Sequence, residues 1–358
     1  PEVLLRMVGV LLDYLIRGAD YVRLDAVGYM WKTPGTRCIH LEKTHQLVKL
    51  FRAIADQVAP GTVIITETNV PHRDNISYLG NGHDEAQMVY QFSLPPLVLH
   101  AIHTGSARAL RQWASSLDLS SNDTTFFNFL ASHDGIGLNP ARGILSEVEI
   151  VALVRDLALE GALVSYKNNP DGTTSPYEIN VTYLDALNRE ADDDATRLKR
   201  FLLAHAILLV FPGVPAIYIQ SIVGGRNDYD GVRAAGHNRA INRQKYDLQT
   251  IEAALAGEEW LRQQIYTRLG QLIQLRRRQP AFHPDNPMTI SESENALLVL
   301  RRHSPDSNVG LLCVFNLSGR PVETPLPEAR MWQDLISGEK MDGTQPVKLD
   351  AWQFMWLR

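Results

Sequence analysis

The chain has 358 residues and a formal net charge of −5, and 45% of its residues are hydrophobic while 21% are charged. These fractions exclude a disordered or fibrous chain, and the length is sufficient for a large core with one or two smaller domains. The mildly negative charge without a basic stripe argues against nucleic acid, and no apolar run approaches the ~20 residues that span a membrane, so we expect a small-molecule partner.

Helical and strand patterns alternate along the first two thirds of the chain. Apolar residues at helical spacing begin the chain and stop at Gly18, a typical helix end, and a strand is expected directly afterwards. The predicted strands are 21–24, 63–66, 88–92, 125–130 and 214–219, and the predicted helices between them are 43–58, 97–117 and 198–209. Strands that alternate with helices imply parallel β-α-β units.

The predicted fold class is therefore α/β. A closed (β/α)8 barrel has eight strands, whereas five are expected here, so the sequence is typical of the C-terminal portion of such a barrel, about strands 4–8. The alternative is an open doubly wound sheet. Ligands of an open sheet gather at one switch point, whereas acidic residues close three different strands in this chain, which favours the ring.

Residues 1–285 are predicted to form the barrel portion, with one long interruption at 139–189. That excursion contains a helix at 147–160 and a polar loop at 168–176. Because long loops inside compact domains are usually functional, we expect it to act as a lid. Residues 286–358 show short strands separated by turns, which predicts a small antiparallel β domain. Cys38 and Cys313 lack metal-ligand spacing, so we expect two reduced thiols in a cytoplasmic protein.

Three acidic residues stand at the C-terminal ends of predicted strands, namely Asp25, Glu67 and Asp134. Arg23 precedes Asp25 by two residues and can reach the same point. Barrels of this kind carry out their chemistry at these strand ends, so three acids there suggest a glycosyl-transferring site. Each acid taken singly has a structural alternative: an ion pair with Arg23, a helix cap or solvated acid, and an Asx-type turn, respectively.

Three segments in order resemble the signature segments of glycoside hydrolase family 13, the α-amylase clan. They are 19–26 (ADYVRLDA), 65–67 (ITE) and 131–134 (ASHD). Four further segments are similar to those of its sucrose phosphorylase subgroup: 27–29 (VGY), 93–97 (SLPPL), 133–137 (HDGIG) and 238–243 (NRAINR). The resemblance runs from the first helix to the C-terminal β domain, and it implies the (β/α)8 barrel.

By this resemblance, Asp25 is the nucleophile, Glu67 is the general acid/base, and Asp134 steadies the transition state. A retaining enzyme forms a covalent glycosyl-enzyme through one carboxylate, while a second carboxylate about 5–5.5 Å away protonates the leaving oxygen. The third acid can hold sugar hydroxyls more tightly as positive charge develops at the anomeric carbon.

His133 and Arg239 resemble clan residues that bind the glucose next to the bond being broken. Their structural alternatives are a surface histidine with satisfied hydrogen bonds and a salt-bridged arginine. Arg23 is grouped with these binding residues because its charge is expected to keep Asp25 ionised.

Four residues are predicted on the acceptor side: Tyr29, Asn69, Tyr177 and Glu178. Both tyrosines match the family, and ordinary aromatic packing is the alternative for Tyr29. Asn69 stands where sucrose phosphorylases carry a histidine, and Glu178 replaces a glutamine of the family's mobile loop. A carboxylate there would repel incoming phosphate unless it were paired, either by Lys167 or by a residue outside this chain.

The resemblance thus implies a retaining α-glucoside phosphorylase, which transfers glucose from sucrose, sucrose 6'-phosphate, glucosylglycerol or glucosylglycerate to phosphate, giving α-glucose 1-phosphate. The alternatives are a hydrolase or transglucosidase of the same fold, and a non-catalytic binding subunit. No organic cofactor or metal is expected.

The clan's first signature has no counterpart here, so we expect a missing N-terminal segment of the same polypeptide to complete the barrel. We also expect the isolated chain to be inactive. Whether the protein forms a homodimer stays open.

Overall fold

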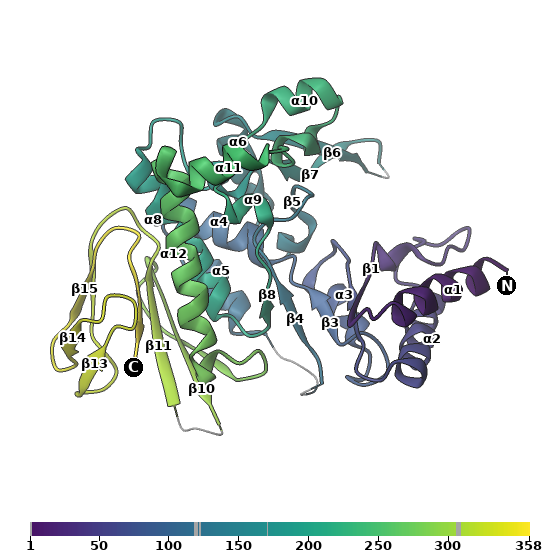
Figure 1. The fold of residues 1–358 in the computed structure, drawn as a ribbon, viewed down its shortest axis with the longest axis horizontal. Coiled ribbons are helices and arrows are strands. Elements are labelled where there is room, and N and C mark those ends of the chain that lie inside the picture. The colour runs from purple at the N-terminus through teal and green to yellow at the C-terminus, as the bar shows by residue number, and fades with distance from the viewer. Residues whose placement is uncertain (1, 118–120, 122, 170, 306–308) are drawn as a thin grey trace. The chain divides into compact units, whose positions relative to one another are not determined.

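The computed structural model describes residues 2–117, 121, 123–169, 171–305 and 309–358, and it divides into two compact units (Figure 1). The first unit comprises Pro1–Phe92 and Asp118–Asn128, and the second comprises Ser93–Leu117 and Phe129–Arg358. Cys38 and Cys313 are free thiols, as predicted. Within the described ranges, the helices are too short or too polar to cross a membrane.

The first unit contains four neighbouring parallel strands in the order β1-β2-β3-β4. They are β1 (Tyr21–Leu24), β2 (Val63–Thr66), β3 (Met88–Tyr90) and β4 (Thr125–Asn128). The strands predicted in this unit are therefore confirmed, although the third and fourth end two residues early. The helical elements are α1 (Glu2–Ile16), α2 (Glu42–Val58) and α3 (His72–Ile76), with single turns η1 (Val27–Tyr29) and η2 (Ser77–Leu79).

Helix α2 is the crossover that two neighbouring parallel strands require. Its buried residues Val48, Phe51 and Ala55 recur at helical spacing, and Phe51 and Ala55 pack in one core with the buried residues of α1 and of strands β1 and β2. The register of β1 and β2 pairs Leu24 with Thr66. Consequently, the residues that follow these two strands emerge at the same end of the sheet.

The second unit is mainly helical before its C-terminal strands. The helices are α4 (Leu94–Thr104), α5 (Arg108–Ala114), α6 (Glu147–Leu159), α7 (Tyr183–Ala186), α8 (Asp194–Val210), α9 (Ile219–Ile222), α10 (Tyr229–Ala235), α11 (Leu248–Ala253) and α12 (Trp260–Arg277). Shorter turns are η3 (Asn139–Ala141), η4 (Asn238–Asn242), η5 (Ala254–Glu258) and η6 (Pro280–Phe282). Gly105 ends α4 with a left-handed φ of 63°, which splits the helix predicted at 97–117 into two. The strand predicted at 214–219 is only β8 (Val214–Pro215); residues 216–218 are irregular, and α9 begins at Ile219.

The excursion predicted as a lid at 139–189 contributes two strands to an antiparallel sheet in the order β5-β7-β6, whose strand β5 lies just before it. Its strands are β5 (Ile136–Gly137), β6 (Leu163–Asn168) and β7 (Thr174–Asn180). The helix of the excursion is confirmed as α6. The polar loop predicted at 168–176 is wrong at both ends, since Asn168 belongs to β6 and residues 174–176 belong to β7, where they pair with residues 166–168 of β6. Pro170, part of that predicted loop, lies outside the described residues.

The C-terminal region is antiparallel, as predicted. One sheet has the order β16-β11-β10-β9, and two further pairs join β12 to β15 and β13 to β14. These strands are β9 (Met288–Ser291), β10 (Leu297–Ser304), β11 (Val309–Asn316), β12 (Val322–Thr324), β13 (Met331–Gln333), β14 (Lys340–Asp342), β15 (Val347–Leu349) and β16 (Phe354–Leu357). Along β10, Leu298 and Leu300 enter the core that contains α4, α8 and α12, whereas Leu297 and Val299 enter a second core around Trp332.

Two arginines, the partly buried Arg276 and the fully buried Arg302, cover the C-terminal end of α8, which packs beside α12 (Figure 1). Arg276 donates from Nε to the carbonyl of Leu209 at 2.8 Å. Arg302, whose exposed fraction is 0%, donates from Nη1 to the carbonyl of Val210 at 2.5 Å. Its Nη2 donates to two further carbonyls, those of His283 (2.6 Å) and Asn286 (3.0 Å). Burial lowers the pKa of Arg302 to about 10, which leaves it cationic at neutral pH where the negative end of the helix dipole favours it.

Replacing Arg302 by Met should therefore destabilise the fold strongly. The substitution would leave the buried carbonyl of Val210 and two partly buried carbonyls without their donor. Because a buried acceptor left unsatisfied costs about 1–3 kcal/mol and the partly buried ones cost less, we expect a loss of ~2–4 kcal/mol in the free energy of unfolding. Urea unfolding monitored by tryptophan fluorescence measures the change.

Arg301→Met is the matched control, because the neighbouring Arg301 makes a surface pair with Glu328 at 2.6 Å between half-exposed side chains. Such a pair contributes about 0–1 kcal/mol. Equal losses in the two variants would contradict the role assigned to Arg302.

Candidate active site

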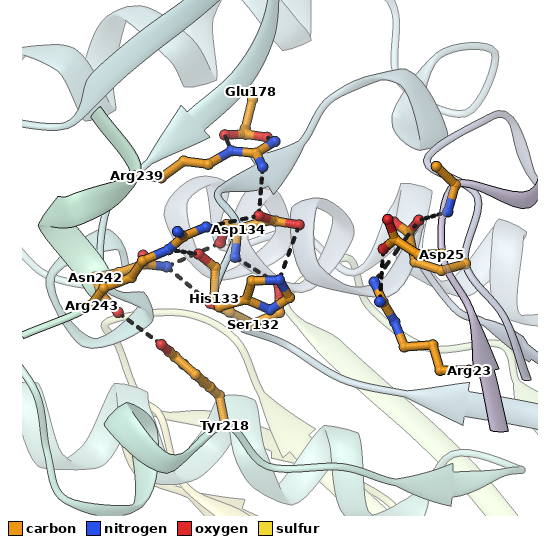
Figure 2. Close-up of polar contacts among 12 residues, drawn as sticks. Arg23, Asp25, Ser132, His133, Asp134, Glu178, Tyr218, Arg239, Asn242 and Arg243 are labelled. Atoms are coloured by element: carbon orange, nitrogen blue, oxygen red, sulfur yellow. Dashed lines mark hydrogen bonds and ion pairs between the residues drawn. The ribbon is translucent and has the colours of Figure 1, made fainter. Parts of the chain in front are cut away.

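Asp25 and Glu67 emerge at the same end of two adjacent strands, directly after β1 and β2. The backbone ties them together, because Glu67 N donates to the carbonyl of Leu24 at 3.1 Å and Val27 N donates to the carbonyl of Glu67 at 3.2 Å. Arg23 contacts both carboxylates, with 2.7 Å from Nη1 to Asp25 Oδ1 and 3.9 Å from Nη2 to Glu67 Oε2 (Figure 2). The two predicted acids of the first unit therefore share one cation.

The two carboxylates differ in their surroundings. The Asp25 side chain is 72% exposed, whereas that of Glu67 is 13% exposed. Ala26 adopts a left-handed conformation with φ 47°, and its N–H donates to Glu67 Oε2 at 2.9 Å. A non-glycine residue in this conformation costs roughly 1–2 kcal/mol, so the fold accepts local strain where it directs a backbone donor at Glu67.

Arg23 lies over the ring of Tyr90, with 5.3 Å from its guanidinium carbon to the ring centroid. Burial works against the charge of Arg23, but Tyr90, Glu67 and Asp25 together raise its pKa above the ordinary value. The cation that holds the acidic pair is thus fully charged throughout the pH range in which carboxylates ionise.

Asp134 is the centre of a second charged cluster, which lies within the second unit (Figure 2). Its Oδ1 accepts from Arg239 Nη1 at 2.6 Å and from Arg243 Nη2 at 3.2 Å. His133 Nε2 lies 3.8 Å from the other oxygen, Oδ2. The predicted glucose-binding residues His133 and Arg239 are therefore both neighbours of the predicted transition-state acid.

Asn242 and Arg243 hold the backbone of the loop that carries Asp134. Asn242 Nδ2 donates to the carbonyls of Ser132 at 2.9 Å and Asp134 at 3.0 Å, and Arg243 Nε donates to the carbonyl of His133 at 2.6 Å. The sequence offered these two residues only as part of the 238–243 segment and assigned them no role. The structure gives them one: they fix the position and the backbone of Asp134.

Glu178 is bound by Arg239, with 3.0 Å from Nε to Oε1 and 2.7 Å from Nη2 to Oε2. Figure 2 shows the guanidinium of Arg239 between the carboxylates of Glu178 and Asp134. The predicted pairing of Glu178 with Lys167 is therefore wrong. Lys167 Nζ instead donates to Asn139 Oδ1 at 3.0 Å, because β6 directs it toward the η3 turn.

The remaining predicted acceptor residues lie in separate elements. Tyr29 is 54% exposed on η1, and Asn69 follows β2 in the same unit. Tyr177 lies on β7 beside Glu178, and its carbonyl accepts from Leu138 N at 3.0 Å. Among the residues that the structure describes, groups of three or more His, Cys, Asp or Glu side chains suited to a metal ion are absent.

Comparison with characterised proteins gives relatives along the whole chain, although no family model matches it. The chain is 59% identical over 358 residues to a glucosylglycerate phosphorylase of Escherichia coli K12, covering 100% of this chain and 64% of that protein. It is 46% identical over 354 residues to a glucosylglycerate phosphorylase of Allomeiothermus silvanus, covering 98% and 62%. It is 33% identical over 289 residues to a sucrose phosphorylase of Agrobacterium vitis, covering 78% and 54%. The chain thus spans between 54% and 64% of the length of these curated relatives.

Solved structures bear out the predicted fold. A sucrose 6F-phosphate phosphorylase of Thermoanaerobacter thermosaccharolyticum matches with a TM-score of 0.74 at 23% identity, over 96% of this chain and 62% of that one. An α-amylase of H. orenii matches with a TM-score of 0.66 at 17% identity, over 100% and 64%. The chain is therefore α/β with the barrel-type fold of these enzymes. Together, the comparisons confirm the resemblance drawn from the motifs: this chain is related along its length to the sucrose phosphorylase subgroup of glycoside hydrolase family 13.

Proposed function

We propose that the protein containing this chain is a glucosylglycerate phosphorylase, which converts glucosylglycerate and phosphate to glycerate and α-glucose 1-phosphate. The proposal rests on one observation, the order of the sequence identities between this chain and its relatives. Glucosylglycerate phosphorylases are 59%, 46% and 41% identical to the chain, whereas sucrose phosphorylases reach 33% and a glucosylglycerol phosphorylase 26%. Among the glucosides that the motifs left open, this order favours glucosylglycerate.

The proposed mechanism is a double displacement at the anomeric carbon. The Asp25 carboxylate attacks that carbon and forms a glucosyl ester, while Glu67 gives its proton to the departing glycerate oxygen. Phosphate then attacks the same carbon, loses a proton to Glu67 and releases Asp25, which restores both acids and retains the α configuration. The common cation Arg23 and the adjoining strand ends of Asp25 and Glu67 support this pairing of roles.

Asp134 is proposed to stabilise the positive charge that develops at the anomeric carbon, and His133 and Arg239 to contact the same glucosyl group. Support comes from the resemblance and from the contacts of the second unit, where both residues adjoin Asp134. A carboxylate whose Oδ1 is already bound by two arginines is fixed before substrate arrives, which is the preorganisation that electrostatic stabilisation requires.

A cytoplasmic location is proposed from the two free thiols and the small anionic substrates. The following points stay predictions: the domain boundary at 285/286, the lid role of 139–189, the acceptor roles of Tyr29, Asn69 and Tyr177, the contribution of a further N-terminal segment, and the homodimer.

The proposed activity predicts a specific product pattern. A polypeptide that carries this chain at the full length of its relatives should release glucose 1-phosphate from glucosylglycerate only when phosphate is present. A coupled glucose 1-phosphate assay across glucosylglycerate, sucrose, sucrose 6'-phosphate and glucosylglycerol should give the highest kcat/KM for glucosylglycerate, by at least ~10-fold, since unpaired polar groups strongly penalise the wrong leaving group. Phosphate-independent release of glucose would instead identify a hydrolase.

The Asp25→Asn variant of the same polypeptide should lose at least ~1,000-fold in kcat, because removal of a covalent nucleophile blocks both displacements. Its circular dichroism should be unchanged, since the side chain is 72% exposed. Asp13→Asn is the matched control: Asp13 lies in the same unit, is half exposed and pairs with an arginine, Arg17, at 2.9 Å. Undiminished turnover in Asp25→Asn, or equal losses in both variants, would refute the assigned nucleophile.

A further inference from the structure

We propose that Glu178 is a positioning residue: it orients Arg239 against Asp134 and does not itself contact phosphate or the leaving group. The inference rests on the proposed function of this site. It replaces the acceptor-side role that the sequence predicts for Glu178, and it starts from two observations, the pairing of both Glu178 oxygens with Arg239 and the burial of the Glu178 side chain, which is 2% exposed.

The pairing leaves Glu178 little capacity for another ligand. Each oxygen accepts one N–H of the guanidinium, in the two-pronged geometry that gives arginine–carboxylate pairs their directional strength. A buried carboxylate without such a partner would cost several kcal/mol, so the pair must persist in the folded unit. The hydrogen bonds to Glu178 also contribute most to the raised pKa of Arg239.

The backbone around Glu178 is equally constrained. Glu178 lies in the middle strand of the β5-β7-β6 sheet, opposite Gly137 on one side and Ser165 on the other. Gly135 passes so close that a Cβ there would stand 2.6 Å from Glu178 Cγ and 2.6 Å from the carbonyl oxygen of Ile179. Only glycine fits this approach, so the carboxylate is anchored by paired strands and a close backbone contact.

Because Glu178 is held in place, it fixes Arg239, and Arg239 in turn orients the carboxylate of Asp134. With Nε and Nη2 bound by Glu178, the remaining Nη1 points at Asp134 Oδ1, 2.6 Å away. Because the guanidinium is planar, fixing two of its nitrogens fixes the direction of the third. Arg243 binds the same oxygen, which leaves Oδ2 as the oxygen that faces His133. Glu178 therefore determines, through Arg239, how Asp134 presents its carboxylate.

Glutamine cannot replace this function. The amide of Glu178→Gln would oppose one guanidinium N–H with a second donor and would break one of the two hydrogen bonds. Since a misplacement of about 1 Å in a catalytic group can cost ~100-fold, we expect kcat/KM to fall 10- to 100-fold. The loss should be equal for glucosylglycerate and sucrose, because Arg239 acts on the glucosyl part that both share, and the KM for phosphate should be unchanged.

A double-mutant cycle on the full-length polypeptide tests the route through Arg239. Lysine at position 239 keeps the charge but cannot bind Glu178 through two nitrogens, so Glu178→Gln should have less than a 3-fold further effect in the Arg239→Lys background. Asp192→Asn is the matched control in the same unit, because Asp192 pairs with Arg200 at 2.5 Å away from this cluster. It should leave the kinetics unchanged.

The opposite results would overturn the inference. Additive losses in the cycle, a leaving-group preference changed more than 3-fold, or a raised KM for phosphate would show that Glu178 contacts a substrate directly. If Glu178→Gln melts too early to be assayed, Glu178→Asp keeps the charge but shortens the reach, and it should show the same substrate-independent loss. If the unsubstituted enzyme proves to be a hydrolase, the proposed function fails, but the cycle is read equally well from glucose release.

Discussion

The pairing of carboxylates with arginine is the interaction on which both charged clusters depend. Ionised groups removed from water must find an opposite charge and satisfied hydrogen bonds. In the first unit, Arg23 meets this demand for Glu67 and also pairs with the exposed Asp25. In the second unit, Arg239 meets it for Glu178 and, with Arg243, for Asp134. The arginines thereby turn acids that could adopt many rotamers into groups with fixed directions.

The same requirement applies in the core away from the site, where the buried charge is a cation and its partners must be negatively polarised groups. Arg302 is buried and binds three backbone carbonyls, including the terminal carbonyl of α8, in place of a carboxylate. The helix terminus supplies partial negative charge and unpaired acceptors, so one guanidinium satisfies several groups at once. The helices and the C-terminal sheet of the second unit are therefore joined by directional polar contacts as well as by their apolar core.

Local sequence was sufficient to predict the features that repeat at short range. Helical periodicity predicts α1, α2 and α8, apolar runs predict β1 and β2, and strand ends predict Asp25 and Glu67 at one edge of the sheet. The failures concern pairings between distant residues. Residues 174–176 have turn-like composition, but pairing with β6 makes them part of a strand, and the apolar run after Val214 continues as the helix α9. Glu178 finds its partner 61 residues away, which no local pattern encodes.

The pairing of Glu178 with Arg239 explains how a carboxylate can stand at a position where the sequence alone suggests repulsion of an anionic substrate. A glutamate in place of a glutamine adds a negative charge to a site that is proposed to accept phosphate, and this charge alone would repel the anion. In the structure, Asp134 and Glu178 contribute two negative charges and Arg239 and Arg243 two positive ones, so the cluster is formally neutral. Because Arg239 neutralises Glu178 inside the protein, the extra carboxylate need not oppose an anionic substrate. In the proposed mechanism, its charge serves instead to hold Arg239, the arginine assigned to the glucosyl group.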